Sequence, residues 1–342
     1  MAAETTTTRT GGPGVGTRIA GAIARQRELS LAGLMVVLAA FVAIQAPNFL
    51  SASNLTQVTV VASIIAIAAV GQALVILTRN VDLSVEAMMG LVAFVVADLL
   101  KFNVLPAPAA IAAGVALGLL LGMTNGFLIA ALRVPAIVAT LGTLSIYRGI
   151  DFLIAGGKQV TLGDLPAGYT DPARATVLGI PIFVLIAIAI VVFVAAVLRW
   201  TRAGRHVYAV GSNPEAASIL GIRSGFVVFG VFSACGLLAG VAGVMWGMNY
   251  GTINATAASG VTLQVVAAVV VGGVNINGGS GTVIGAALGA LFLGLISNAL
   301  ILLRLSQFWL QAIYGAVILV AVSLDAFLVR GLKRAALARR SR

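Results

Sequence analysis

Uncharged polar side chains stand at several points inside long apolar stretches of the sequence. Amide and hydroxyl groups are costly at membrane depth unless they face a partner group or a water-filled cavity. They also suit transient contacts with a hydroxylated solute better than fixed charges do. We therefore predict that they line a solute pathway, with hydrogen bonding between helices as the alternative, which Asn125 before Gly126 fits better. The pathway candidates are Gln72, Thr140, Thr143 and Asn298.

Two polar breaks, 79–84 and 272–277, follow β-branched runs and weakly resemble one another. Duplicated halves with paired helix breaks are a common plan among transporters. We therefore predict a pair of broken helices, although chance also explains so short a similarity. The residues at these breaks, which the resemblance described below marks as hinge residues, are Arg79, Asn80, Asp82, Ser84, Gly272 and Gly273.

The segment 199–223 predicts a short helix in its middle part. Asn213 can cap this helix, Pro214 suits its first turn and Gly221 can end it. Glu215 would then lie near the positive end of the helix dipole, which stabilises an anion. Such a helix between two spans could seat in a groove of a partner protein, and an ordinary connecting helix is the alternative.

Few residues point to chemistry that this chain could perform itself. No acidic residue falls at the middle of a predicted span, which disfavours a proton-coupled pump but leaves open a sodium site built from carbonyl oxygens. The sequence has no GxxxxGK[ST] loop for nucleotide phosphates, and its glycine-rich run at 278–281 fits close helix packing better. One histidine and one cysteine make no credible metal cluster, so we predict no metal site.

The elements that must position these residues are membrane-spanning helices. The chain has 342 residues, of which 60% are apolar and only 9% charged, whereas about 25% are charged in soluble domains. Segments 182–198 and 226–246 carry no charge and are long enough to cross a bilayer core. We predict an all-α polytopic membrane protein with about ten spans, and eight as the fallback. The predicted spans are 29–46, 56–78, 84–100, 107–132, 135–150, 180–198, 224–250, 261–273, 281–303 and 308–328.

Two of these spans, 135–150 and 261–273, are too short to cross comfortably, which is typical of broken helices beside a transport pathway. The longest external connection, 155–179, is predicted to be either a docking surface or a solvated connector.

The distribution of basic residues predicts the orientation. With both termini in the cytoplasm, sixteen of the 21 Lys and Arg residues lie inside, as the positive-inside rule requires. This distribution explains the net charge of +11 better than nucleic-acid binding does. We predict a disordered cytoplasmic tail over 1–28, a membrane domain over 29–328 and a basic cytoplasmic tail over 329–342, without a cleaved signal peptide.

Four stretches, taken in order, resemble the permease subunits of bacterial sugar ABC importers of the ribose and autoinducer-2 type, which are inner-membrane components of binding-protein-dependent transport systems. These stretches are 77–85, 135–149, 204–222 and 269–282, and the resemblance extends from about residue 48 to residue 325. In the family, the loop similar to 204–222 docks on the ATPase. The resemblance therefore implies an ATPase-coupling surface, in which we expect Glu215, Ala216 and Ala217 to face the partner. Its candidate residues are Arg205, His206, Asn213, Pro214, Glu215, Ala216, Ala217 and Gly221.

The chain also departs from the family pattern. Many members have two glycines at the positions of Arg79 and Asn80, where autoinducer-2 permeases are closer to this sequence. Glu86 stands where a glycine is usual, and Thr262 and Gln264 stand where acidic residues are frequent. The role of those acids is therefore in doubt here.

The resemblance implies no catalysis by this chain, and it places ATP and Mg²⁺ on a separate cytoplasmic ATP-binding subunit. It further implies a second permease subunit, identical or not, and an extracytoplasmic solute-binding protein, in the lipid of a bacterial inner membrane. A gradient-driven transporter of a small polar solute is the first alternative, and a channel the second. The sequence leaves the solute open among pentoses, deoxyhexoses such as rhamnose and autoinducer-2, with branched-chain amino acid permeases as distant relatives.

Overall fold

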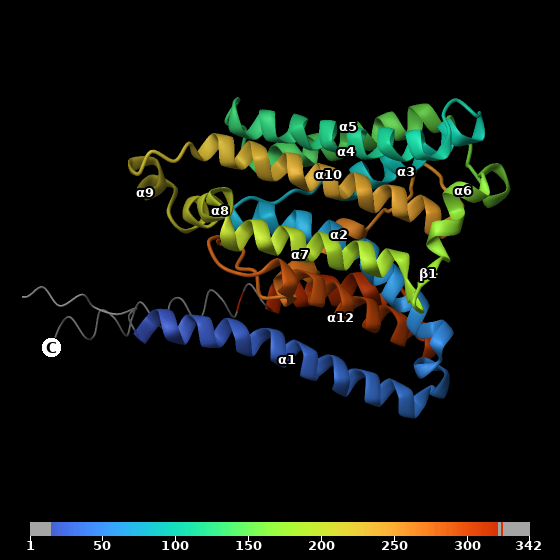
Figure 1. Cartoon of the computed structure of the whole chain (residues 1–342), viewed down its shortest axis with the longest axis horizontal. Helices are drawn as coiled ribbons and strands as arrows, with labels where there is room; N and C mark the ends of the chain where they lie inside the picture. The colour runs from blue at the N-terminus through green and yellow to red at the C-terminus, as the bar shows by residue number, and fades with distance from the viewer. Residues whose placement is uncertain (1–14, 321–322, 324–342) are drawn as a thin grey trace, which may run out of the picture.

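The computed structural model describes residues 15–320 and residue 323, which form a bundle of roughly parallel and antiparallel helices (Figure 1). The apolar helices of the bundle are α1 (Val15–Gln45), α2 (Ala52–Leu77), α3 (Val85–Lys101), α4 (Ala107–Ala130), α5 (Ala136–Ala155), α7 (Ile182–Trp200), α10 (Ser224–Tyr250), α11 (Val261–Val271) and α12 (Val283–Leu302). A further apolar helix covers Trp309–Val320. The short elements are η1 (Pro47–Leu50), η2 (Leu162–Asp164), α6 (Ala167–Thr170), η3 (Asp171–Ala173), β1 (Thr176–Val177), β2 (Ile180–Pro181), α8 (Arg202–Ser212) and α9 (Pro214–Ile219).

The prediction of an all-α polytopic membrane protein is confirmed. Each of the ten predicted spans coincides with a helix, and within the described residues seven helices are long and apolar enough to cross a membrane. The span predicted at 135–150 was wrongly taken as short, because α5 continues to Ala155 and has 20 residues. The span at 261–273 is short as predicted, since α11 has only 11 residues. Helix α1 begins at Val15, within the tail predicted over 1–28. Residues 1–14 of that tail, and all of the tail predicted over 329–342, lie outside the described residues.

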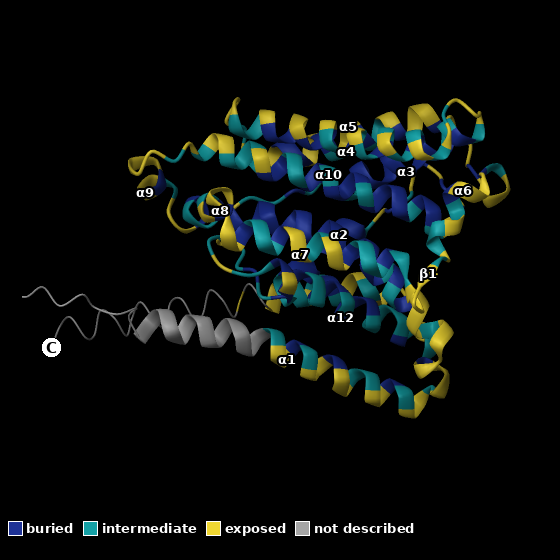
Figure 2. Ribbon diagram, viewed as in Figure 1, coloured by how far each residue is buried: buried dark blue, intermediate teal, exposed yellow. Residues whose placement is uncertain are grey.

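Helix α2 forms the centre of the bundle. It is apolar on all sides, as expected of a helix surrounded by protein, and 94% of its most apolar stretch is buried (Figure 2). The outlying helix α1 is the opposite case, with 11% of its apolar stretch buried. The position of α2 means that any polar group it carries must find a partner inside the bundle.

Helices α4 and α10 cross with their backbones in direct contact. Gly118 and Gly122 on α4 face Gly236 and Gly240 on α10. A Cβ atom placed on Gly118 would lie 2.5 Å from the Cα atom of Gly240, and one on Gly236 would lie 2.5 Å from the Cα atom of Gly122. Two glycines four residues apart on each helix therefore permit this approach, which is a frequent device in membrane helices.

The segment predicted as an external connection folds over one end of the bundle, which we call the α6 side. Tyr169 is buried there and donates a hydrogen bond to the carbonyl oxygen of Val244 at 3.1 Å. Asp164 contacts Lys101 at 3.2 Å, and the backbone N–H of Thr161 together with Lys101 lowers the pKa of this carboxyl. This segment is therefore a folded cap, and its hairpin β1–β2 leads directly into α7.

The opposite end, which we call the α9 side, carries α8 and α9 (left in Figure 1). Among the described loops, the ends of α2, α4 and α7 and the α8–α9 region bring arginines to this side. These are Arg79, Arg133, Arg199, Arg202, Arg205 and Arg223, whereas Lys101, Lys158, Arg174 and Arg304 belong to the α6 side. The larger number of basic residues on the α9 side agrees with a cytoplasmic location.

The glycine crossing predicts a sharp difference between two positions of α10. Gly236→Leu should lower the thermal unfolding temperature markedly, because the new side chain must push backbone against backbone, and overpacking costs about 1–3 kcal/mol even where side chains can adjust. Gly230→Leu is the matched control, since nothing lies within 4 Å of a Cβ atom at Gly230. Thermal unfolding of the detergent-solubilised protein measures both, and similar losses would refute the packing argument.

Candidate functional site

Arg79 joins the end of α2 to the end of α8. Its Nε and Nη2 atoms donate to the carbonyl oxygens of Gly211 and Ser212, each at 2.5 Å. The backbone N–H of Gly279 donates to the carbonyl oxygen of Leu77 at 3.0 Å. Three segments far apart in the sequence, the break after α2, the end of α8 and the glycine-rich run, therefore meet at one junction. The planar guanidinium satisfies carbonyl groups that a helix end leaves without partners.

Helix α9 follows this junction directly. The side-chain oxygen of Asn213 accepts a hydrogen bond from the backbone N–H of Ala216 at 3.0 Å, Pro214 stands in the first turn, and Gly221 has a φ of +79°. The predicted capping geometry is thus present. Glu215 is exposed near the N-terminus of the helix.

The expectation that Ala217 faces a partner is wrong, because only 2% of this residue is exposed. The exposed apolar residues are instead Ile219 and Leu220, at 86% and 79%, followed by Phe226 at 77%. Arg205 is exposed and His206 partly so, on α8. The sequence did indicate this apolar surface, because two large apolar residues, Ile219 and Leu220, stand together at the end of the short helix.

The non-helical segment 78–84 returns from the α9 side into the bundle alongside α2. Gln72 lies about one and a half turns before the end of α2. Its amide group lies 3.2 Å from both the backbone N and O of Asp82, and in the orientation that satisfies both it donates to the oxygen and accepts from the N–H. Gln72 is completely buried and bonds within the chain.

The side chain of Asp82 is the centre of a buried hydrogen-bond network. It accepts from the backbone N–H and the hydroxyl of Ser84, at 2.8 and 2.6 Å, and from the amide of Asn125 at 3.3 Å. Asn125 also donates to the Ser84 hydroxyl at 2.8 Å, and Tyr147 donates to the carbonyl oxygen of Leu121 at 2.9 Å beside it. The network fixes Ser84, the residue that precedes α3, against α4.

No acidic residue was expected at the middle of a span, and the burial of acidic side chains inside the bundle was not predicted. Asp82 and Asp151 are both fully buried within the bundle. Asp82 was overlooked because its segment was read as a loop at the membrane surface, and Asp151 because the predicted span stopped one residue before it. A charged residue usually ends an apolar span, and here Arg148 and Asp151 lie within one.

The other pathway candidates also contact protein. Thr140 and Thr143 are buried on α5, and their hydroxyls donate to backbone carbonyls of Ala136 and Thr140 at 2.8 and 3.3 Å. Asn298 and Asn54 exchange two hydrogen bonds between α12 and α2, at 2.8 and 3.0 Å. In this conformation Asn298 makes the bond between helices of the alternative prediction, whereas Thr140 and Thr143 bond to the backbone of their own helix.

The two hinge glycines have different roles. Gly273 adopts a φ of +85°, which suits a break in the chain. Gly272 is in the helical region, but a Cβ atom there would lie 2.2 Å from the carbonyl oxygen of Gly285. Gly272 is therefore required by close packing of α11 on α12 rather than by backbone conformation.

A second polar cluster joins the beginnings of α3 and α11. Glu86 accepts hydrogen bonds from the backbone N–H groups of Gly260 and Thr262, at 2.9 and 3.3 Å, and so caps α11. Arg148 contacts Glu86 at 3.3 Å. Since α11 is about 16 Å long and ends on the α9 side, this cluster lies near the middle of a ~30 Å hydrocarbon core. The sequence analysis singled out Glu86 and Thr262 only as departures and missed Arg148.

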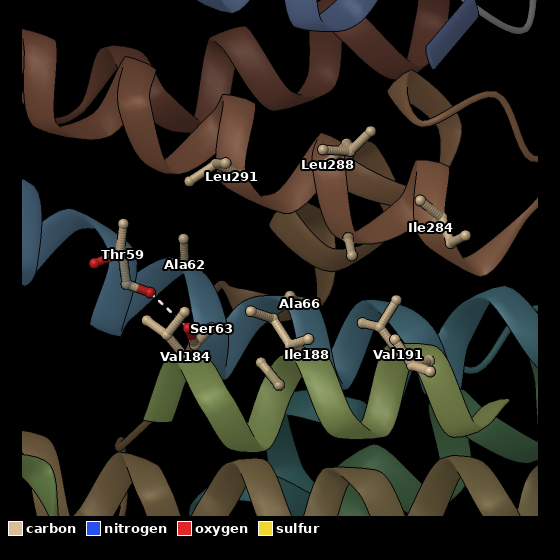
Figure 3. A pocket seen from close by; sticks show the side chains of 13 residues that line it. Thr59, Ala62, Ser63, Ala66, Val184, Ile188, Val191, Ile284, Leu288 and Leu291 are labelled. Carbon is tan, nitrogen blue, oxygen red and sulfur yellow. Dashed lines mark hydrogen bonds between the residues drawn. The ribbon is translucent and has the colours of Figure 1, made fainter. Parts of the chain in front are cut away.

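An apolar groove of about 290 Å³ opens between α2, α7 and α12 (Figure 3). Its lining includes Ala66, Ile188 and Leu288, and its only side-chain polar groups are the hydroxyls of Thr59 and Ser63. The Ser63 hydroxyl already donates to the carbonyl oxygen of Thr59 at 2.6 Å. A binding site for a hydroxylated solute needs several convergent polar groups, so this groove does not suit one.

The amide pair between α2 and α12 can be tested by a double-mutant cycle. Asn298→Leu and Asn54→Leu should each lower stability, because each leaves the other amide without its partner. The double variant should lose less than the sum, with a coupling energy of about 0.6 kcal/mol, which is typical of such bonds in membranes. Thermal unfolding gives the cycle, and strictly additive losses would mean that the pair contributes no stability.

The Asp82 network predicts a difference between two acidic residues. Asp82→Ala should destabilise the protein by about 1–3 kcal/mol, because it leaves buried donors of Ser84 and Asn125 unpaired. Asp98→Ala is the control, since Asp98 is partly exposed on α3. Denaturation of the purified protein measures both, and an equal effect of the two changes would contradict the role assigned to Asp82.

Comparison with known proteins agrees with this arrangement. A family model described as branched-chain amino acid transport system / permease component matches residues 54–322. The autoinducer 2 import system permease protein LsrC of Escherichia coli (strain K12 / DH10B) is 38% identical over 312 residues, which cover 91% of this chain and 90% of the relative. The LsrC proteins of Escherichia coli O157:H7 and Salmonella typhi are 39% and 38% identical, covering 88% and 91% of this chain and 87% and 89% of theirs. No solved structure matches the chain. The extent of these matches shows that the chain belongs to the permease family of the branched-chain amino acid transport system / permease component type.

Proposed function

We propose that this multi-pass inner-membrane protein is the permease subunit of an ATP-binding-cassette importer for a monosaccharide or sugar-like solute of the pentose, deoxyhexose or autoinducer-2 class. The observation that carries the proposal is the similarity to LsrC along 91% of the chain. LsrC is named as a permease of autoinducer 2 import, which makes autoinducer 2 the first solute to test.

A separate cytoplasmic ATP-binding subunit would bind ATP and Mg²⁺ and supply the energy. The α9 side supports this proposal, because a capped helix there presents Glu215, Ile219 and Leu220 to a partner. Arg79 ties the start of α9 to the break after α2, and Gln72 ties that break to the bundle. Movement of α9 by the ATPase would reach the first turn of α3 along this path.

The remaining partners would be a second permease subunit and an extracytoplasmic solute-binding protein. The exposed apolar face of α5, with Leu141, Ile146 and Leu153, must be covered by lipid or by the second permease. The folded cap on the α6 side would meet the binding protein. Gln72, Thr140, Thr143 and Asn298 would contact solute only in a conformation that breaks their present hydrogen bonds.

Reconstitution tests the source of energy. The chain in proteoliposomes, supplied with its ATPase and binding-protein partners, should take up labelled autoinducer 2 or a sugar in an ATP-dependent and vanadate-sensitive manner. A gradient-driven transporter regains some support from Asp82 and Asp151, because both acidic side chains are buried inside the helical bundle. Uptake that persists with vanadate and stops with a protonophore or on removal of sodium would favour that alternative.

The docking surface can be tested with two highly exposed apolar residues. Ile219→Asp should abolish co-purification of the ATPase and reduce uptake at least tenfold, because it places a charge at the apolar contact. Leu178→Asp is the matched control at the opposite end of the molecule, where Leu178 is 98% exposed on the β1–β2 turn. Loss of ATPase binding with Leu178→Asp instead would reverse the orientation proposed here.

A further inference from the structure

One carboxyl group in the bundle is left without a partner. Asp151 lies on the buried stripe of α5 with Ala139, Thr143, Tyr147 and Ala155. Its side chain is completely buried, and neither of its oxygens has a hydrogen-bond partner. An isolated ionised carboxylate in apolar surroundings is very costly, so such a group is more stable with a proton bound.

Arg148, on the preceding turn of α5, is occupied elsewhere. Its Nη2 atom contacts Glu86 at 3.3 Å, and its Nη1 atom donates to the carbonyl oxygens of Ala255 and Ala257, each at 3.1 Å. The two salt bridges in the described part of the chain are Lys101–Asp164 and Arg148–Glu86, so Arg148 and Asp151 form none with each other. Yet a Cβ atom on Gly90 would lie 3.4 Å from both Arg148 Nη1 and Asp151 Oδ2, so the two groups border the same small space.

Few other charges face this space. Helix α3 contributes Glu86, and its remaining charged residues, Asp98 and Lys101, lie about two turns or more beyond Gly90. Helices α4 and α10 and the segment 251–260 contain no charged residue. Two carboxyl groups therefore lie near the Arg148 guanidinium. Glu86 contacts it in this structure, and Asp151 does not.

We propose that Asp151 is a proton-binding site, and that its bound proton keeps Arg148 on Glu86 and on the segment 251–260. When the proton leaves to water, Asp151 becomes a second carboxylate within reach of the same guanidinium. Arg148 is then drawn from the carbonyl oxygens of Ala255 and Ala257, which it now fastens above the start of α11. The attachment of the segment 251–260 to Arg148 therefore loosens as the pH rises.

Infrared spectroscopy of the purified protein in nanodiscs tests the bound proton. A neutral carboxylic acid has a C=O stretching band well separated from the bands of a carboxylate. We expect such a band at neutral pH, with part of its intensity lost in Asp151→Asn and retained in the control Asp98→Asn. A band region unchanged by Asp151→Asn at neutral pH would overturn the proposal.

Cysteine labelling in nanodiscs tests the consequence for Arg148. Ala255 is 6% exposed, so Ala255→Cys in a Cys235→Ala background should react slowly with a maleimide while the segment is fastened. Its rate, divided by that of the exposed Ser259→Cys to remove the pH dependence of thiol chemistry, should rise severalfold at alkaline pH.

The same ratio should stay constant when Asp151→Asn is added, because the amide cannot ionise. A ratio that rises equally with and without Asp151 would refute the proposal. Ala258→Cys, at 3% exposure, provides a second position should Ala255→Cys fold poorly. Both measurements require neither a partner nor transport, so their outcome is independent of the proposed function.

Discussion

A non-helical segment inside an apolar bundle must satisfy its backbone polar groups with protein, and most of the candidate site follows from this requirement. Residues 78–84 meet it with the Gln72 amide on the backbone of Asp82 and with the Asp82 carboxylate on the N–H of Ser84. Each partner then needs further partners, which brings in Asn125 and the start of α3. The polar residues of the inner half of the bundle thus form one connected structure between α2, α3 and α4.

The same requirement explains the departures from the family pattern. The family resemblance led us to expect acidic residues at the positions of Thr262 and Gln264 and a glycine at that of Glu86. In this chain Glu86 provides the carboxylate from α3 and accepts the N–H groups of Gly260 and Thr262. The Thr262 hydroxyl in return accepts the backbone N–H of Glu86 at 3.1 Å. The negative charge at the start of α11 is therefore present, although it comes from a different helix.

Much of the fold could be predicted from the sequence, because charge-free apolar runs fix the spans and basic residues fix their direction. The glycine pairs of α4 and α10 were also readable, at a spacing of four residues. The candidate site was less predictable. Charged residues such as Arg148 and Asp151 usually mark the end of a span. Nothing in the nearby sequence shows that Arg148 contacts Glu86 on another helix. The burial of Ala217 depends on how the six-residue helix α9 packs on its neighbours, which the sequence of that helix does not determine.

The backbone contact between α4 and α10 has a mechanical consequence. Packed helices usually slide past one another by small shifts that side chains absorb through changes of rotamer. Between Gly118, Gly122, Gly236 and Gly240 there are no side chains to adjust, so a shift would press one main chain into the other. Helices α4 and α10 must therefore move together as one rigid pair. Helix α3 meets α10 equally closely at Met89 and Gly243, so relative movement during transport would belong to other elements, such as α5 and the half-length α11.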